Sequence, residues 1–284
     1  MKKLNFWALL AFTFGVINFS ACTSNDDLGS EATLTATALD DSQIGSISDN
    51  ILASADEYVL PIESSNYAPV SGLQRIPIVK NVDGVIITVD KSGTEFPKTI
   101  TLDYGTTGIK DKRDNVLKGK IIIVVSNKMT VAGSTRSYSF VDFSVNDNKI
   151  KGSKLVTFNG ETDGKPSWSV VVKDTVVKVD GKSVIVNSTR TRTLTDNNAT
   201  PKIYFDDSFS ITGSATGINA KGVAYTMKIE KPLITVGAWP VFVAGTTLIT
   251  SEKRTVLIDY GDGTKDFKAT ATVNGVTKEF NLRK

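Results

Sequence analysis

The sequence contains no histidine and a single cysteine, Cys22, among its 284 residues. Without histidine, Ser-His-Asp and Cys-His nucleophiles, His-ligated zinc and His-based acid–base chemistry are excluded. One thiol cannot form an internal disulfide or a cysteine-ligated metal site. The formal net charge is only +3, which does not indicate the basic surface that nucleic acid requires. We therefore expect no cofactor, no nucleic-acid partner and no enzymatic activity, with a hydrolase that uses carboxylates alone as the alternative.

The N-terminus combines a basic start, a short apolar run and small residues before the cysteine. Lys2 and Lys3 precede the apolar run from Leu4 to Phe19, and Ser20-Ala21 leads directly into Cys22. This order predicts a signal peptide over residues 1–21, because the run is too short for a membrane span. A cysteine at this place resembles the bacterial lipobox, which implies that Cys22 is acylated, with palmitate among its acyl groups, and becomes the first residue of a membrane-anchored protein.

Acidic residues are concentrated directly behind this cysteine. Eight Asp and Glu residues and no Lys or Arg occur from Thr23 to Glu57, whereas the chain after Glu57 has 31 basic against 22 acidic residues. The Ser-, Thr- and Ala-rich composition of residues 22–39 predicts a flexible acidic tether. Acids in this position resemble the surface-export signals of Bacteroidetes lipoproteins, with an ordinary polar linker as the alternative. We expect an outer-membrane lipoprotein, exposed at the surface or otherwise on the periplasmic face.

Residues 40–58 form the one helical candidate. Ile44, Ile51 and Ala55 recur at helical spacing, and Ile47 and Tyr58 extend the same face. Asp40, Asp41 and Ser42 are suited to cap the helix start, whereas Gly45 weakens the helix. This face is expected to pack on the rest of the domain, with a partner-binding element as the alternative.

Residues 59–284 are predicted to form a single all-β domain. Fourteen β-branched or aromatic segments, from Val82–Val89 to Thr277–Leu282, alternate with turns such as 146–148, 179–182 and 273–276. These turns contain Asn, Asp and Gly, which tolerate the positive φ of tight hairpins. Consecutive hairpins without crossover helices predict a large antiparallel meander, in the form of a curved sheet, a sandwich or a barrel-like closure.

Two segments of the β region match each other. A strand, a turn and a second strand that ends in Asp-Tyr-Gly occur at residues 84–105 and again at residues 245–261. This repeat indicates two related hairpins, which would bring the ends of the domain together if they paired or packed. Chance similarity between β-rich hairpins is the alternative.

The order of several short motifs resembles a family of uncharacterised Bacteroidetes lipoproteins. The motifs are Ile100-Thr-Leu-Asp-Tyr-Gly105, the segments 118–122, 145–152 and 188–193, Phe209-Ser-Ile-Thr-Gly213 and Ile258-Asp-Tyr-Gly-Asp-Gly263. The resemblance covers the chain from about Asp40 onward and implies the β fold, export and lipidation, but no activity. Many members have a cysteine after each Asp-Tyr-Gly turn, near Ile109 and Lys265 here, and this chain has neither.

Acidic turn residues are the candidates for a metal site. Asp259, Asp262 and Asp266 surround a Gly-rich turn, as Asp103 and Asp111 do in the first repeat. Carboxylates in turns can bind calcium, but the spacing does not fit an EF-hand and Asp-Gly is ordinary in hairpins. We therefore predict no metal site and keep these residues as weak candidates.

Two arginines and two tryptophans are the candidates for ligand binding. Arg190 and Arg192 lie on one face of a strand, where they are suited to bind a carboxylate or phosphate. The alternating Thr and Arg pattern is also typical of a solvent-facing or edge strand, and this structural reading is favoured. Trp168 and Trp239 are suited to stack on sugar rings, with core packing as the alternative.

These observations predict a lipid-anchored envelope protein that acts as a non-enzymatic binding or structural module. The alternative is a carrier that shelters a lipid or another apolar ligand on a concave sheet. The partner is expected to be a protein, a glycan or a lipid. A concave apolar sheet that is left uncovered would favour the carrier, whereas a filled core would exclude it.

Overall fold

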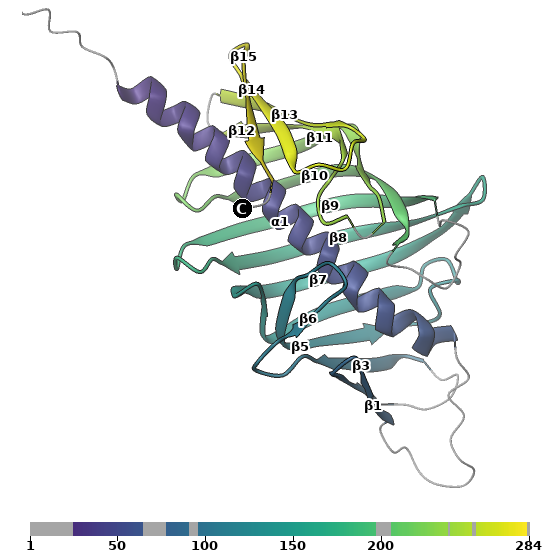
Figure 1. Cartoon of the computed structure of the whole chain (residues 1–284). Coiled ribbons are helices and arrows are strands. Elements are labelled where there is room, and N and C mark those ends of the chain that lie inside the picture. The colour runs from purple at the N-terminus through teal and green to yellow at the C-terminus, as the bar shows by residue number, and fades with distance from the viewer. Residues whose placement is uncertain are drawn as a thin grey trace, which may run out of the picture.

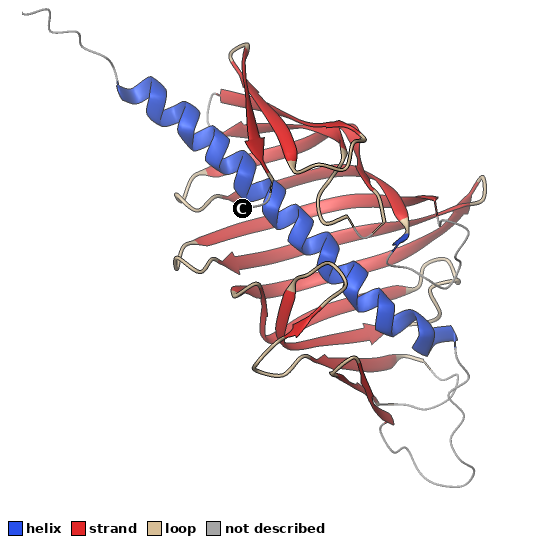
Figure 2. Cartoon of the chain, in the orientation of Figure 1, coloured by secondary structure: helices blue, strands red, loops and turns tan. Residues whose placement is uncertain are grey.

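The computed structural model describes residues 25–64, 78–90, 96–196, 206–237, 239–251 and 254–282, with the side chains of the helix described at Asp40 and from Gln43 to Ile62. The chain forms one helix and one antiparallel sheet, and Figures 1 and 2 show the helix lying diagonally across one face of that sheet. The elements are α1 (Asn25–Ser64), β1 (Ile78–Val82), β2 (Val85–Val89), β3 (Lys98–Asp103), β4 (Ile109–Lys110), β5 (Val116–Val125), β6 (Thr135–Val145), β7 (Asn148–Thr162), β8 (Lys165–Val177), β9 (Ser183–Asp196), β10 (Ser208–Ile218), β11 (Ala224–Thr235), β12 (Ala244–Ser251), β13 (Arg254–Asp262), β14 (Lys268–Val273) and β15 (Val276–Asn281).

The sheet is a meander in which the strands pair in chain order. The order runs from β1 to β15, with β4 set aside as a short partner of β5. Because β1 and β15 end this order, the sheet is open, and among the predicted forms the curved sheet is the one observed. The predicted turns are confirmed at Asn146-Asp147 and Asn274-Gly275, where both residues have positive φ.

Strand boundaries differ from the prediction at two places. The segment Val82–Val89 is not one strand, because Asp83 and Gly84 adopt positive φ and turn the chain between β1 and β2. Conversely, the predicted break between Val172 and Thr175 is absent, and β8 runs through it. The second case follows from the long pairing of β8 with both β7 and β9, which supports the whole strand.

The two matching segments are hairpins, as expected, but they do not pair with each other. The first contains β2 and β3, the second contains β12 and β13, and the strands from β5 to β11 lie between them. The tyrosines of the two Asp-Tyr-Gly motifs are buried at equivalent places, where Tyr104 packs near Phe143 and Tyr260 near Phe242. The repeat therefore places similar tyrosines near opposite ends of the sheet and does not bring those ends together.

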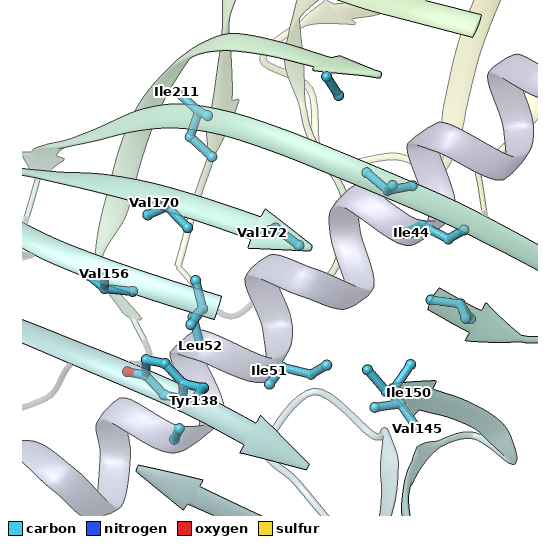
Figure 3. Packing of buried hydrophobic residues seen from close by; sticks show 14 of the residues in the cluster. Ile44, Ile51, Leu52, Tyr138, Val145, Ile150, Val156, Val170, Val172 and Ile211 are labelled. Carbon is cyan, nitrogen blue, oxygen red and sulfur yellow. The ribbon is translucent and has the colours of Figure 1, made fainter. Parts of the chain in front are cut away.

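Helix α1 is longer than predicted and is buried against the sheet. It begins at Asn25 and ends at Ser64, so residues 25–39, which the sequence assigns to a tether, are helical in backbone. Figure 1 shows this N-terminal part extending beyond the sheet. Ile44, Ile51 and Ala55 of the predicted face are buried, which confirms that the face packs on the domain. Figure 3 shows Ile51 and Leu52 directed toward inward side chains of the strands.

The core lies between α1 and the inward face of the sheet. Alternation along each strand sends one set of side chains toward the helix and the other toward solvent. In β5, for example, Ile121, Ile123 and Val125 are buried, whereas Val124 is exposed. The outward face is thus uncovered in the described part of the sheet, and the core has a single layer of strands on one side and a single helix on the other.

Candidate functional site

The register of the central strands brings two of the sequence candidates together. Phe158 on β7 pairs with Trp168 on β8, Trp168 pairs with Arg192 on β9, and Arg192 pairs with Ile211 on β10. Directly paired residues project from the same face of a sheet. Trp168 and Arg192 are therefore neighbours on the inward face, near the open end of the hairpin that β8 and β9 form.

A second row of paired residues lies one step deeper beneath the helix. Arg136 on β6 pairs with Val156, Val156 with Val170, and Val170 with Arg190. All four side chains are buried. The valines provide an apolar floor in the middle of the row, and the two arginines stand at its ends.

These rows and the C-terminal half of α1 enclose a pocket with a volume of about 420 Å³, which we call the α1–sheet pocket. Its walls are mainly apolar. They come from Leu52, Leu60, Met129, Tyr138, Val156, Phe158, Trp168, Val170, Leu194 and Phe209. Its charged members are Asp56, Lys128, Arg136, Glu161, Arg192 and Asp207. Figure 3 shows Leu52, Tyr138, Val156 and Val170 in this region. The volume and the apolar lining are typical of small-molecule sites.

Aromatic rings form one wall of the pocket. The Trp168 ring lies 5.7 Å from Phe158 and 6.1 Å from Phe209, measured between centroids. The Arg192 guanidinium carbon lies 3.4 Å from the centroid of the Phe209 ring. A guanidinium in this position gains a cation–π contact with its face, while its N–H groups stay directed outward along its plane.

The two pocket arginines have different partners. Arg136 donates to Asp56 of α1 over 2.5 Å, so that its charge is balanced by the helix. For Arg192, in contrast, no carboxylate of the described ranges lies within ion-pair distance. Arg192 is only partly buried, and of the two pocket arginines it is therefore the one whose hydrogen-bonding groups are accessible.

Asp207 adds a titratable group to the same pocket. Burial, and then the neighbouring charge of Asp206, raise the pKa of Asp207 from 3.8 to about 6, although the Arg192 charge acts in the opposite direction. A carboxyl group of this kind is mostly ionised at neutral pH and gains a proton in mildly acidic conditions. The pocket thus contains one carboxylate, Asp56, that is fixed by an arginine and another that can change its charge.

A buried charge network lies beside the pocket under the middle of α1. Lys154 on β7 forms an ion pair with Asp174 on β8, and its Nζ also donates to Ser48 Oγ over 2.7 Å. Burial lowers the pKa of Lys154 and raises the pKa of Asp174, because a buried charge loses its hydration. Arg190 lies 3.5 Å from Asp49, and a Cβ added at Gly45 would lie only 3.2 Å from its Nη2. Glycine therefore lets the helix approach this guanidinium.

Acidic residues of α1 repeatedly pair with basic residues of the sheet and its loops. The pairs are Asp40–Lys178 (2.7 Å), Asp49–Arg190 (3.5 Å), Asp56–Arg136 (2.5 Å), Glu57–Lys112 (3.0 Å) and Glu57–Arg113 (3.5 Å). Asp40 was expected to cap a helix start, but it lies inside the helix and also accepts from the backbone N–H of Ala220 over 3.2 Å. Four of the eight acids noted in the sequence thus hold the helix on the sheet.

The weak metal candidates do not form a common site. Asp259 accepts from the N–H of Gly261, Asp262 from Thr264, and Asp266 from Lys268, so that each carboxylate is used within its own turn. Within the described ranges, no group of three acidic or other ligating side chains is arranged to hold a metal ion. These aspartates act as turn residues there, as Asp103 does by accepting from Gly105.

The other candidates are placed differently from expectation. Arg190 and Arg192 do not face solvent on an edge strand, because β9 lies between β8 and β10 and its arginine face is directed toward α1. Trp239 is not part of the pocket: it stacks on Phe267 with 4.7 Å between centroids, and its Nε1 donates to the carbonyl of Asp266 over 3.3 Å. Only Trp168 and Arg192 of these candidates line the pocket.

Several pocket and network residues were not predicted from the sequence. Lys154 shares the inward face with Val156 and Phe158, and Arg136 shares it with Tyr138. Period-two alternation was therefore a usable signal for both cations once the apolar positions had been assigned inward. No such signal existed for Asp207, because it lies just before β10 and its role depends on the strands beside it.

Cys22 lies outside the described residues. Among the residues that are described, no helix has the length and hydropathy needed to cross a bilayer. Comparison of the chain with protein-family models, with curated proteins and with solved structures finds no match in any of the three.

Proposed function

We propose that this protein is a lipid-anchored envelope protein of the outer membrane that binds an apolar small molecule in the α1–sheet pocket without transforming it. The observation that carries this proposal is the pocket itself, a space of about 420 Å³ with mainly apolar walls between a helix and a sheet. A module with a purely structural role has no need of such a space, because close packing would be more stable.

The pocket favours a carrier over a purely structural module, but a carrier whose ligand occupies only part of the sheet. The inward face is not left uncovered, since α1 packs on it from Ile44 to Ile62. The α1–sheet pocket lies near Leu52 and Leu60, at the end of the helix where the aromatic wall stands. We therefore propose a ligand of limited size at one end of the sheet, and not a lipid spread over the whole face.

Ligand binding is tested by native mass spectrometry of the full-length protein after its release from the membrane in detergent. We expect the protein purified from its native envelope to retain a bound small molecule. Val156→Trp fills the pocket floor and should abolish retention, whereas Leu155→Trp places the same side chain on the exposed outward face and should not. Retention by V156W with an unchanged fold, measured by circular dichroism, would contradict the proposed site.

The lipid anchor is tested separately on the full chain. Cys22 follows Ser20-Ala21 at the end of the apolar run, which supports acylation of its thiol. Metabolic labelling with an alkyne-modified palmitate should mark the wild type and should not mark Cys22→Ala. Labelling of C22A, or recovery of the unlabelled wild type in the soluble fraction, would exclude this anchor.

Hydrolysis by carboxylates is a second candidate function, favoured by one observation. Asp56 and Asp207 line the same pocket; Asp56 pairs with Arg136, and Asp207 has a pKa raised to about 6. Two carboxyl groups in one cleft, one of them with a raised pKa, are the arrangement that glycosidases use. Release of fluorophore from a panel of aryl glycosides, lost in Asp207→Asn, would establish this function in place of simple binding.

A further inference from the structure

We propose that the α1–sheet pocket binds an anionic amphiphile, whose hydrocarbon chain lies in the apolar interior and whose carboxylate or phosphate head is bound by Arg192. This inference rests on the proposed function and specifies its ligand class. It combines three observations: the depth of the apolar lining, the position of the Arg192 guanidinium, and the pairing of the other charges.

The interior of the pocket suits a hydrocarbon chain. Leu52, Val156 and Val170 are buried and line it, and Tyr138 closes it beside them. The charged members Lys128 and Glu161 are exposed, which places them at the opening. An amphiphile that enters with its chain first would exchange water for these apolar walls, and binding would strengthen with each methylene that is buried.

Arg192 suits an anionic head group. Its guanidinium packs over the Phe209 ring, with 3.4 Å from Cζ to the ring centroid, and this contact restricts its position. A planar guanidinium presents paired N–H donors that match the two oxygens of a carboxylate or phosphate. Among the described residues no carboxylate forms an ion pair with Arg192, so these donors are not committed to a partner of that kind.

The other charges of the pocket largely balance one another. Asp56 is already paired with Arg136, and Lys128 and Glu161 at the opening have opposite signs. Asp207 is close enough for the Arg192 charge to act on its pKa, and it is partly desolvated. An anion bound at Arg192 would further disfavour the charge of Asp207, which would then take up a proton and become a hydrogen-bond donor to the head group.

Isothermal titration calorimetry of residues 25–284 with a series of C12 amphiphiles tests this inference. Dodecanoate and dodecyl phosphate should bind at least tenfold more tightly than dodecanol, and dodecyltrimethylammonium should bind less tightly than the alcohol. Within the carboxylates, lengthening from C8 to C12 should increase affinity about three- to fourfold per methylene. The tighter of the two anions identifies the source of the ligand as a fatty acid or a phosphate-bearing lipid.

Arg192→Gln should reduce the affinity for dodecanoate about tenfold and leave that for dodecanol unchanged. Arg192→Lys should retain part of the preference, because it keeps the charge but not the paired donors. The matched control is Lys173→Gln, which removes one positive charge from the exposed face of β8 and should change neither affinity. Circular dichroism of each variant verifies folding.

The outcomes separate the ligand class from the proposed function. If the wild type binds the anions and the alcohol equally, or if R192Q keeps the anion preference, pocket binding stands and the head-group assignment is overturned. If R192Q does not fold, R192K and the wild-type series decide alone, and equal affinities there overturn the assignment. If the wild type binds no member of the series, both the ligand class and apolar binding in this pocket are overturned.

Discussion

The buried ion pair of Lys154 and Asp174 provides a test of how α1 is held on the sheet. Both side chains are almost fully buried, with 0% and 2% of their surfaces exposed. Lys154 Nζ also donates to Ser48 of the helix, whereas Asp174 Oδ1 is buried without a hydrogen-bond partner among the described residues. Asp174→Asn removes the negative charge at almost constant volume and leaves the ammonium group of Lys154 uncompensated.

Loss of one partner from a buried pair costs about 3–5 kcal/mol, because the remaining charge has lost its hydration. The amide oxygen introduced by D174N and the Ser48 hydroxyl both remain as acceptors for the ammonium group, so we expect a loss of about 3 kcal/mol. This corresponds to a decrease of about 1 M in the urea midpoint of unfolding. The combined variant Lys154→Met and Asp174→Leu should recover to within ~1 kcal/mol of the wild type, since no charge is left to desolvate.

The pH dependence of D174N distinguishes charge burial from a packing defect. Burial lowers the pKa of Lys154, whereas the negative charge of Asp174 raises it. Removal of that charge in D174N would therefore lower the pKa of Lys154 further. A lysine with a lower pKa in the folded than in the unfolded state destabilises the protein below its folded pKa, and this loss is recovered as the pH rises toward the unfolded value. The deficit measured by urea unfolding should therefore be smaller at about pH 9.5 than at neutral pH. A deficit below ~1 kcal/mol, or a double variant as unstable as D174N, would refute this reasoning.

Substitutions at four other positions test local features by the same urea unfolding. Gly45→Leu should lose at least about 2 kcal/mol through collision with the Arg190 guanidinium, whereas in Gly45→Ala the gain of ~1 kcal/mol in helix propensity should roughly offset a smaller collision. Asp207→Asn should be neutral below pH 4 and should raise stability above pH 7. The change in its pKa from 3.8 to about 6 makes the ionised carboxyl unfavourable in the folded state by at most about 3 kcal/mol, and by roughly 1 kcal/mol after solvent screening of a half-buried group. Gly213→Ala should lose more than about 2 kcal/mol, because a Cβ there would lie 2.2 Å from a carbonyl oxygen of β9. Gly181→Ala, a turn position with positive φ and open space, should lose only about 1 kcal/mol. Equal losses at the two glycines, or a D207N effect that does not change with pH, would contradict these assignments.

The local part of the fold could be predicted from the sequence because turn chemistry and period-two alternation are local signals. The hairpin at Asn146-Asp147 follows from residues that tolerate positive φ. The turn at Asp83-Gly84 carries the same signal as Asp180-Gly181, but the apolar residues on both sides of it favoured one continuous strand. The choice among an open sheet, a sandwich and a closed barrel was not local, since it depends on whether the first and last strands meet.

The helix boundaries could not be predicted, because the residues that suggested a start have partners elsewhere. Asp40 has the side chain of a good N-cap, but its carboxylate is bound by Lys178. Gly45 disfavours a helix by propensity, but its missing side chain makes room for Arg190. In both cases a contact with a distant strand determines the role of the residue, and a contact of this kind cannot be seen in a helical window of the sequence.

The pocket depends on the same kind of distant contact. Trp168 and Arg192 were recognisable separately as an aromatic and a basic candidate, but only the pairing of β8 with β9 makes them neighbours. The alternation of Thr and Arg in β9 favoured a solvent-facing strand as long as arginine was taken to be exposed. Its arginines face inward because α1 brings Asp49 to one of them and Phe209 lies under the other.

The unequal distribution of charge along the chain is thus in part a docking arrangement between α1 and the sheet. Buried cations on strands would destabilise the sheet alone, and the helix compensates Arg190 with Asp49 and Arg136 with Asp56. Asp40 and Glu57 pair in the same way with cations of the adjoining loops. Each pair fixes the position of the helix along the sheet, because a shift by one residue would rotate the acids away from their partners. The side chains of the acids before Asp40 lie outside the described ones. A surface-export signal that depends on charge is therefore best tested by substitution of those earlier acids, because substitution of the four paired acids should lower stability first.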